Sequence, residues 1–441
     1  MISYNRGLKV RHEVDVFVAG GGPAGIAAAL AAARQGASVL IIEGTACFGG
    51  MGTSGLVPAF MQFADGANFL AGGIGREVYD RLWNARGVSP EDVYESPRAT
   101  LSIHAETLKR VYDEMVTSSG VDYAFMTQMV DVIAANGQVQ AVVCSGKSGL
   151  YAVRARVYVD GTGDGDLAVW AGAAYEKGDS DGRMMAGTLG SLWAGVDWQA
   201  VRDAEERADE ELPRAFADNV FSVEDRHLPG MWRVGRTLAG GNLGHTFGVD
   251  GTDERSLTEA LVYGRKLLTE YERFYREYMS GYDGIEMVST GALLGIRETR
   301  RIVGDYQLVL DDFQNRAVFP DEIGRYSYPV DVHASDPSPE AFAKLMDGLH
   351  SLRLGWGESY GIPYRTLTPK GLSNVLVAGR CISSDRSMQG SVRVMPGCYI
   401  TGQAAGVAAV LAADQDQDVH EVDVAELQSR LKDMGAYLPN C

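Results

Sequence analysis

The hydrophobic pattern at the start of the chain predicts a strand, a turn, a helix and a second strand. Residues 14–19 form an unbroken apolar run, typical of a parallel strand buried on both faces. Residues 23–35 form an alanine-rich helix that ends at Gly36, and the apolar run over 38–42 is the next strand. A helix between two such strands is the usual crossover of a parallel sheet.

Farther along, apolar runs alternate with turn residues. The pattern predicts one helix and then four strands, over residues 105–117, 121–125, 129–134, 139–145 and 151–159. The Asn136-Gly137 pair and the residues around 145–149 are typical of hairpin turns. The last three of these strands are therefore expected to form an antiparallel meander.

The middle of the chain, from about residue 175 to 355, is richer in charged helices and in tryptophan. Three helices are expected there, over residues 197–216, over 256–279, and from the Ser338-Pro339 pair to about residue 352. Ser256 and Glu259 would form the capping box of the second. No repeat or low-complexity linker interrupts the segment, so we expect it to pack against the rest of the chain.

The last part of the chain predicts a strand over residues 374–378 and an alanine-rich helix over 397–413. This helix is shorter than the roughly 20 residues that a bilayer requires. It also contains Gly402, Gln403 and Gly406. We therefore expect protein, and not lipid, to surround it.

Length, composition and charge limit the kinds of protein and of binding partner that are expected. A chain of 441 residues with 46% apolar and 22% charged residues is typical of a globular protein with two domains. The net charge of −18 repels nucleic acid and anionic membrane surfaces, so neither is expected as a partner. The five cysteines are scattered without a CxxC pair, and no signal-peptide core is visible, which favours reduced thiols in a cytoplasmic protein.

A glycine motif lies between the first strand and the first helix. Gly20, Gly22 and Gly25 fit GxGxxG, in which the first glycine turns the chain, the second admits a pyrophosphate and the third lets helix and strand approach. The helix N-terminus would then face the phosphates with free N–H groups. Glu43 ends the second strand, about 20 residues on, where a carboxylate accepts ribose hydroxyls. The motif therefore predicts a bound dinucleotide.

Several further segments carry a family resemblance. In chain order they are EVDVFVAGGGPAGIAAALAAARQGASVLIIE, FGGMGTSGLV, YVDGTGDGDLAVWAGA, GIRETRRIVGDY, YPVDVH, GIPYRTLTPKGLSNVLVAGRCIS and GSVRVMPGCYITGQAAGVAA. Together they resemble the FAD-dependent oxidoreductase family related to succinate dehydrogenase and fumarate reductase flavoproteins. The resemblance covers nearly the whole chain.

The resemblance implies an α/β fold and a domain division. The fold would be a Rossmann-like FAD-binding domain of the glutathione-reductase type, with a parallel sheet plus a β-meander, and with an inserted α+β cap domain. Residues 1–174 and 356–441 would build the FAD-binding domain, and residues 175–355 the cap over the flavin, which carries the substrate site.

The resemblance also implies FAD as the cofactor, bound non-covalently. The histidine that carries covalent flavin in some relatives would fall in GGMGTSG, which has none. The expected cofactor-binding residues are Gly20, Gly22, Pro23, Ala24, Gly25, Glu43, Gly50, Met51, Val130, Gly161, Thr162, Gly163, Asp164, Gly379, Arg380, Gly397 and Thr401. Arg380 stands where relatives place an acidic residue for the ribityl chain, and its role stays open at this point.

Four residues are candidates for catalysis. Arg393 lies where fumarate reductase relatives hold a substrate carboxylate, with Val392 in place of an asparagine, and it would pair with an anion or close the domains as a salt bridge. Arg297 would face the substrate if residues 297–301 are helical, and the alternative is that this arginine cluster ties elements together.

The other two candidates are histidines. His333 follows Asp331 by two residues, so on a strand the carboxylate would orient the imidazole as a general acid or base, and the alternative is a structural histidine. His245, in the glycine-rich GGNLGHTFG loop, would line the cavity.

The expected function is hydride transfer between a small polar or anionic organic substrate and flavin N5. The alternatives are a flavoprotein that uses FAD in group transfer or without redox chemistry, and a flavin redox sensor without turnover. Cys47 has no CxxxxC partner and no second nucleotide-binding fold appears, so electrons would pass through the substrate, oxygen or an external acceptor or donor. Base rates favour a homodimer.

Overall fold

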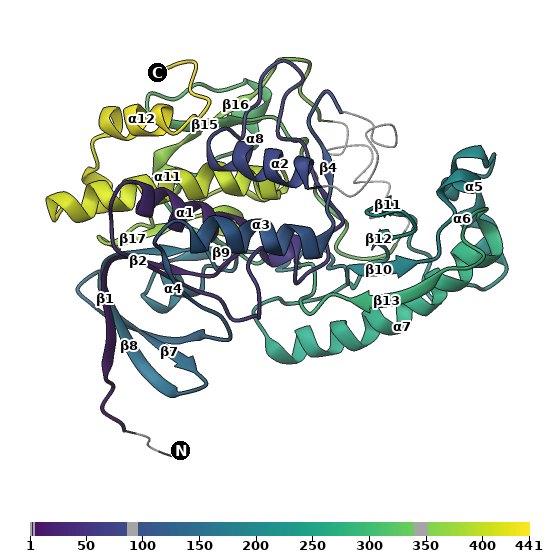
Figure 1. Cartoon of the computed structure of the whole chain (residues 1–441), viewed down its shortest axis with the longest axis horizontal. Coiled ribbons are helices and arrows are strands. Elements are labelled where there is room, and N and C mark those ends of the chain that lie inside the picture. The colour runs from purple at the N-terminus through teal and green to yellow at the C-terminus, as the bar shows by residue number, and fades with distance from the viewer. Residues whose placement is uncertain (1, 3–4, 86–95, 339–351) are drawn as a thin grey trace.

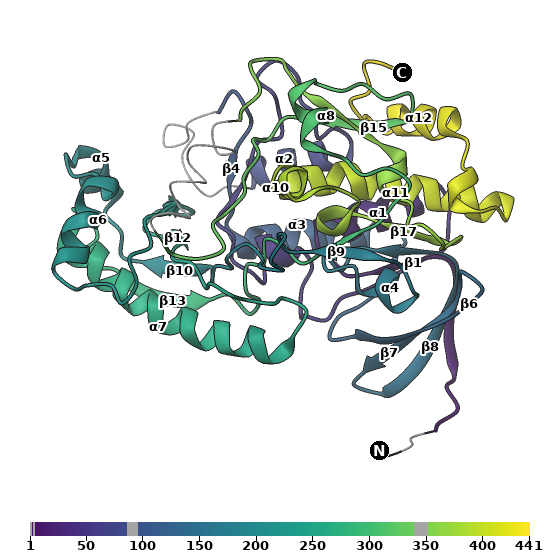
Figure 2. The same ribbon diagram turned by 180° about the vertical axis from the view of Figure 1, so that it is seen from behind.

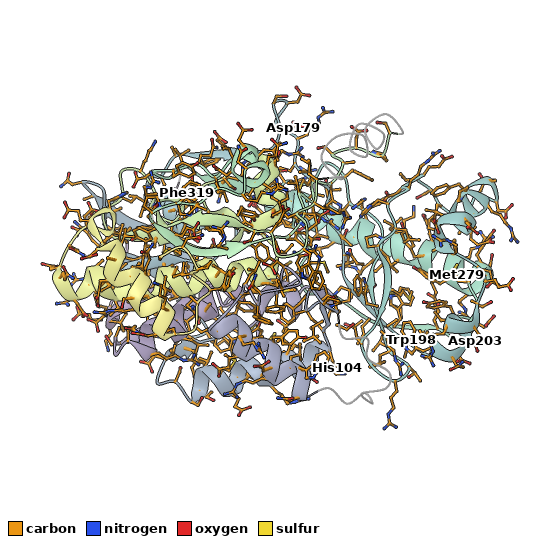
Figure 3. The ribbon with its side chains drawn as sticks, turned by 90° about the horizontal axis from the view of Figure 1, so that it is seen from above. His104, Asp179, Trp198, Asp203, Met279 and Phe319 are labelled. Atoms are coloured by element: carbon orange, nitrogen blue, oxygen red, sulfur yellow. The ribbon has the colours of Figure 1, made fainter. Side chains whose placement is uncertain are left out.

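The computed structural model describes residues 2, 5–85, 96–338 and 352–441, which form a large body and a smaller lobe (Figures 1 and 2). In the view from above, the labelled Trp198, Asp203 and Met279 lie in the lobe and Phe319 lies at the far side of the body (Figure 3). The helix expected after Ser338-Pro339 falls on residues 339–351, outside the described residues.

A parallel sheet forms the centre of the body. β1 (Val10–Ala19) lies between β2 (Val39–Ile42) and β8 (Gly149–Asp160), and it pairs with both in parallel. β2 pairs in parallel with β5 (Asp122–Ala124), and β8 with β17 (Val375–Val377). Val16, Phe17 and Val18 are fully buried, as the unbroken apolar run predicts. The carboxyl ends of these strands therefore meet at one edge.

The sheet continues into the expected meander. β6 (Gln128–Ala135) pairs with β7 (Gln138–Gly146), which pairs with the first half of β8, all antiparallel. Asn136 and Gly137 both have positive φ, at 54° and 75°, which the hairpin turn between β6 and β7 requires. The meander and the parallel sheet share β8, so the α/β fold class is confirmed.

Two small-residue helices lie against each other beside this sheet (Figure 1). They are α1 (Pro23–Arg34) and α11 (Met395–Gln415). A Cβ added at Gly402 or Gly406 would lie 2.2 Å from the carbonyl oxygen of Ala24 or Ala28. Among the described residues α11 is the one helix long and apolar enough to cross a membrane, and its apolar stretch is buried within the protein.

The lobe is a sheet crossed by a long helix. Its four antiparallel strands, in spatial order, are β11 (Gly230–Arg233), β12 (Ala239–Asn242), β10 (Ser191–Ala194) and β13 (Glu286–Thr290). Its helices are α5 (Trp198–Asp203), α6 (Ala208–Ala217) and α7 (Glu254–Tyr278). A separate hydrophobic core, with Trp193 fully buried, holds these elements together.

Two helix predictions in the lobe are wrong in detail. The single helix expected over 197–216 is two helices, because Ala204 is extended and ends α5. α7 begins before Ser256, and its N-cap is Asp253, whose carboxylate accepts the N–H of Ser256 at 2.7 Å. The expected Ser256–Glu259 capping box is therefore not formed, and Asp253 caps the helix three residues earlier.

The helical condition considered for Arg297, Arg300 and Arg301 is not met. Residues 300–302 form strand β14 (Arg300–Ile302), which pairs with β9 (Tyr175–Lys177). Similarly, β15 (Glu322–Tyr326) pairs with β16 (Tyr360–Pro363).

From Ile302 onward the buried residues join the core of the body, whereas the lobe's own core runs from Leu189 to Leu294. The division at 175 and 355 stays a prediction.

Shorter elements complete the body. They are β3 (Ala59–Phe60), α2 (Ile74–Asn84), β4 (Leu101–Ser102), α3 (Ala105–Thr117), α4 (Asp166–Trp170), α8 (Leu310–Gln314), α10 (Arg386–Val392) and α12 (Val424–Asp433). The predicted helix over 105–117 is confirmed to the residue.

Candidate active site

A cavity of about 610 Å³ opens at the carboxyl ends of β1, β2 and β8. One wall comes from the turns that follow these strands, and the other comes from the lobe and from the segment after β15. In open α/β sheets this edge is the usual place for a ligand. The cavity therefore lies between the glycine turns of the body and the lobe.

The glycine motif has three different environments. Gly20 has φ of 93°, and a Cβ at Gly25 would lie 1.8 Å from the carbonyl oxygen of Gly20, so the turn and the close packing both require glycine. A Cβ at Gly22 would meet no protein atom within 4 Å, because Gly22 faces the cavity. This is the arrangement that a diphosphate needs.

Two helices begin at the cavity without a side-chain cap. They are α1, with Gly22 at its N-cap, and α11, with Val394 at its N-cap. The first N–H groups of a helix have no partner within the helix, and the helix dipole makes this end positive. Both helix starts are therefore able to hold negative charge at the cavity wall.

Glu43 is fixed at the end of β2. It is 8% exposed, and its carboxylate accepts the N–H of Gly21 at 2.8 Å and the N–H of Thr45 at 2.7 Å. Glu43 also lines the cavity, as expected for a residue that would accept ribose hydroxyls.

Arg380 joins the second glycine turn to Ile296 at the edge of the lobe. Its guanidinium donates to the carbonyl of Gly163 at 2.9 Å, to the carbonyl of Ile296 at 2.7 Å and to the Asp164 carboxylate at 2.6 Å. The Thr299 hydroxyl donates to the same carboxylate at 2.6 Å. The acidic residue missing at position 380 is thus replaced by an arginine that holds the turn in place.

Most predicted cofactor-binding residues line the cavity. Those that do are Gly20, Gly22, Pro23, Ala24, Glu43, Gly50, Met51, Gly161, Thr162, Gly163, Asp164, Gly379 and Arg380. Gly25, Val130, Gly397 and Thr401 lie outside its wall. Val130 is 43% exposed, because alternation along β6 turns its neighbour Met129 inward instead. The Thr401 hydroxyl accepts the N–H of Gly379 at 3.1 Å and so supports the wall from behind.

Arg297 is buried at the cavity and bonds only to neutral groups. It is 8% exposed, and its Nη1 donates to the carbonyl of Ala186 at 2.7 Å and to the Thr188 hydroxyl at 2.9 Å. Among the described residues no carboxylate lies within ion-pair distance of it. Burial, and then the charge of Arg393, lower the pKa of Arg297 to about 10, so it stays charged at neutral pH.

Arg393 forms a salt bridge, although both partners lie in segments that pack in the core of the body. Its Nη2 donates to the Asp331 carbonyl at 2.8 Å and lies 3.3 Å from the Asp331 carboxylate. Its Nε is buried and has no hydrogen-bond partner among the described residues. Arg393 also lines the cavity, so a donor remains for a bound anion.

His333 and Asp331 form the predicted pair, although no strand is assigned there. Nε2 of His333 lies 3.3 Å from Oδ1 of Asp331, and Nδ1 lies 3.1 Å from Nε2 of His245. Nδ1 of His245 in turn lies 2.9 Å from Oδ2 of Asp225, off the direction of a well-aligned hydrogen bond. His333 lines the cavity, whereas His245 lies behind it.

A third histidine completes this cluster. The His227 ring lies parallel to that of His245 and at right angles to that of His333. Burial, and then His245, lower the pKa of His227 to about 4, and burial, followed by the charge of Arg297, lowers that of His333 well below its usual value. No sequence pattern singles out His227 or Asp225, because they lie in an irregular loop about 100 residues before His333.

Comparison with known proteins identifies the class of fold. The profile of the family described as FAD dependent oxidoreductase matches residues 15–431. The structure is similar to a geranylgeranyl bacteriochlorophyll reductase-like protein from Thermoplasma acidophilum, with TM-score 0.50 and 12% identity over 96% of this chain and 84% of that one.

Two other solved structures are similar with TM-score 0.44. One is a p-nitrophenol 4-monooxygenase from Pseudomonas putida, 12% identical over 96% of this chain and 84% of that one. The other is a myxobacterial chondrochloren halogenase described as FAD-dependent, 14% identical over 96% of this chain and 78% of that one. No curated protein matches the sequence.

Proposed function

The chain belongs to the FAD-dependent oxidoreductase family, and we propose that this enzyme moves a hydride between its FAD and a small polar or anionic organic substrate. When bound, FAD supplies the two-electron chemistry. The chain supplies the binding: Gly20, Gly22 and the start of α1 would hold the diphosphate, and Glu43 the ribose. The open space before Gly22 is the feature of the fold that fits this cofactor.

The observation that supports an anionic substrate is Arg297. A buried guanidinium without an acidic partner is costly, since its charge has lost water and gained no counter-charge. Arg297 lines the cavity, and Arg393 adds a buried, unpartnered Nε beside Asp331. A carboxylate or other oxyanion bound here would supply the missing negative charge.

We also propose a kinship with succinate dehydrogenase and fumarate reductase flavoproteins. It is supported by the position of Arg393 in GSVRVMPG, directly before α11. In the same proposal, residues 175–355 cover the substrate, and the free thiols of all five cysteines fit a cytoplasmic location.

Hydride transfer requires a proton to move as well, and His333 is the proposed group. Its ring is positioned by Asp331 on one side and by His245 on the other. An imidazole held in this way is suited to general acid–base chemistry.

The test is anaerobic bleaching of the bound flavin against a panel of metabolites matched in size but differing in charge. We expect carboxylate-bearing alcohols or dicarboxylates to bleach the flavin and their neutral amides to fail. Subsequent addition of oxygen separates an oxidase from a dehydrogenase. A flavin that no panel member bleaches would contradict the proposal and favour a redox sensor.

A further inference from the structure

Three imidazoles converge beside the cavity from three separate parts of the chain. His227 lies in the loop between α6 and β11, His245 follows β12, and His333 follows β15. One ring nitrogen from each lies within 4.8 Å of the others. His245 and His333 are only 4% and 6% exposed, so this is a built interior cluster.

The spacing of the rings is that of ligands around one tetrahedral centre. With metal–nitrogen bonds of about 2.0–2.1 Å, two ligand nitrogens are about 3.3 Å apart and the ring centres about 5 Å apart. Nε2 of His245 and Nδ1 of His333 lie 3.1 Å apart in a hydrogen bond that a bound ion would replace, and the three ring nitrogens lie within 4.8 Å of one another. The three ring-centre distances are 5.1 Å for His227–His245, 4.8 Å for His227–His333 and 5.2 Å for His245–His333.

The outer nitrogens of two rings face carboxylates. Asp225 lies 2.9 Å from Nδ1 of His245, and Asp331 lies 3.3 Å from Nε2 of His333. Asp225 also accepts the backbone N–H of His227 at 3.1 Å, which fixes the third ring's loop. Metal-binding histidines usually donate their second nitrogen to such a carboxylate, which orients the ring and leaves the inner nitrogen free for the ion.

We propose that His227, His245 and His333 bind one first-row divalent transition metal ion, with a fourth position open toward the cavity. Imidazole nitrogens suit zinc, iron, nickel and copper, and three protein ligands with one open position are typical of a catalytic site. His333, Asp331 and Arg297 line the cavity, so the ion would face the substrate space.

The surrounding charges indicate what fills the fourth position. Asp331 pairs with Arg393, Arg297 bonds only to neutral groups, and the imidazole ligands are neutral, so the charge of the ion is left to an anionic oxygen atom. This step rests on the proposed function: a substrate with a hydroxyl oxygen on the ion and a carboxylate on Arg297 would satisfy both. The ion would favour loss of the hydroxyl proton to water, and His333 would act as a ligand in place of its proton role.

Metal analysis of the FAD-loaded full chain, prepared without a polyhistidine tag, tests the site. After dialysis against chelator, Zn²⁺ or Co²⁺ is titrated in and the bound metal is measured by mass spectrometry. We expect one ion per chain, and the Co²⁺ form should show the absorption of tetrahedral coordination beyond the flavin bands.

Substitutions of the proposed ligands test the metal site more specifically than metal analysis of the unsubstituted chain. His227→Ala and His245→Ala should abolish uptake, and Asp225→Asn, which keeps all three ligands, should weaken it by about 10- to 100-fold. His12→Ala is the matched control, because His12 lies on β1 beside Tyr151 and away from the cluster. FAD content and the thermal midpoint of each variant show whether it has folded. A chain that takes up no ion, or His245→Ala protein that binds as much as His12→Ala protein, would overturn the site.

The metal site and the redox function can be tested separately, because metal uptake and flavin bleaching are different measurements. Metal content is measured without substrate, so a flavin that nothing bleaches would contradict the redox function and leave the metal site standing. Conversely, bleaching at an equal rate in metal-free and metal-loaded protein would overturn the role of the ion in holding the substrate.

Discussion

At the scale of single residues, the glycines of the first turn differ in what they tolerate. Gly22 has φ of −72°, which any residue adopts, and open space beyond it, whereas a Cβ at Gly25 would strike the Gly20 carbonyl. We predict that Gly22→Val protein folds but is purified without FAD, because the side chain occupies the phosphate space. Gly25→Val protein should fail to fold. Circular dichroism and flavin absorbance check both, and yellow Gly22→Val protein would contradict the assignment.

Arg297 provides a prediction on substrate binding. Arg297→Gln should weaken binding of the anionic substrate by roughly 10- to 100-fold, since a charged hydrogen bond is worth about 1.5–3 kcal/mol. The thermal midpoint should not fall, because a buried charge without a carboxylate partner is removed. Titration of flavin absorbance measures the affinity, with the exposed Arg76→Gln as control. Equal affinity in the two variants would count against Arg297.

Asp160 provides a prediction on pH. It is fully buried at the end of β8, and burial raises its pKa from 3.8 to about 6, despite hydrogen bonds from Thr162 and Ala168. A carboxyl group with a raised folded-state pKa stabilises the fold below pH 3.8, and this contribution is lost as the pH rises to about 6. The loss is of the order of 3 kcal/mol.

Urea unfolding of the FAD-loaded chain between pH 4 and 7 measures the Asp160 effect, with the Asp160→Asn variant alongside. The amide does not titrate, so the variant should lack this part of the pH dependence even if it is less stable throughout. Parallel pH profiles for the two proteins would rule out Asp160 as its source.

At the scale of elements, the sequence predicts those that depend on local pattern. β1, α1, β2 and α3 follow from apolar periodicity and from glycine and proline signals. The spacing of Arg297, Arg300 and Arg301 would place them on one face if the segment were helical, but this spacing alone does not predict a helix. Pairing with β9, more than a hundred residues earlier, makes residues 300–302 a strand instead.

The contact between α1 and α11 provides a prediction at this scale. An alanine normally favours a helix over glycine by about 1 kcal/mol. Gly406→Ala should nevertheless destabilise the protein, by about 1–3 kcal/mol or more, since its Cβ would lie 2.2 Å from the Ala28 carbonyl. Urea unfolding checks this, and a gain in stability would mean that the helices are less closely packed than described.

At the scale of the whole molecule, the cavity depends on contacts that no local pattern contains. The glycine turns were predictable because each glycine of the motif has a known structural role at its position. The pairing of His245 with His333, and of Arg380 with Ile296, depends on how the lobe folds against the body. These residues are distant in sequence, and for this reason the sequence identified the cofactor wall more completely than the substrate wall.

Arg380 provides a prediction for the molecule as a whole. Arg380→Met removes the hydrogen bonds to Gly163 and Asp164 within the body and to Ile296 at the edge of the lobe. We expect faster hydrogen exchange in residues 239–296 and faster FAD release. Arg365→Gln, which removes a pair with Asp321, is the control. Unchanged exchange in Arg380→Met would indicate that the lobe is held by other contacts.

The contact of α1 with α11 also affects how the chain folds during its translation. These helices are far apart in the sequence, yet they pack against each other beside the nucleotide site. A chain still emerging from the ribosome therefore exposes the alanine-rich face of α1 until α11 has been translated. Premature termination before position 395 should leave a product that quality-control proteases remove before it captures any flavin.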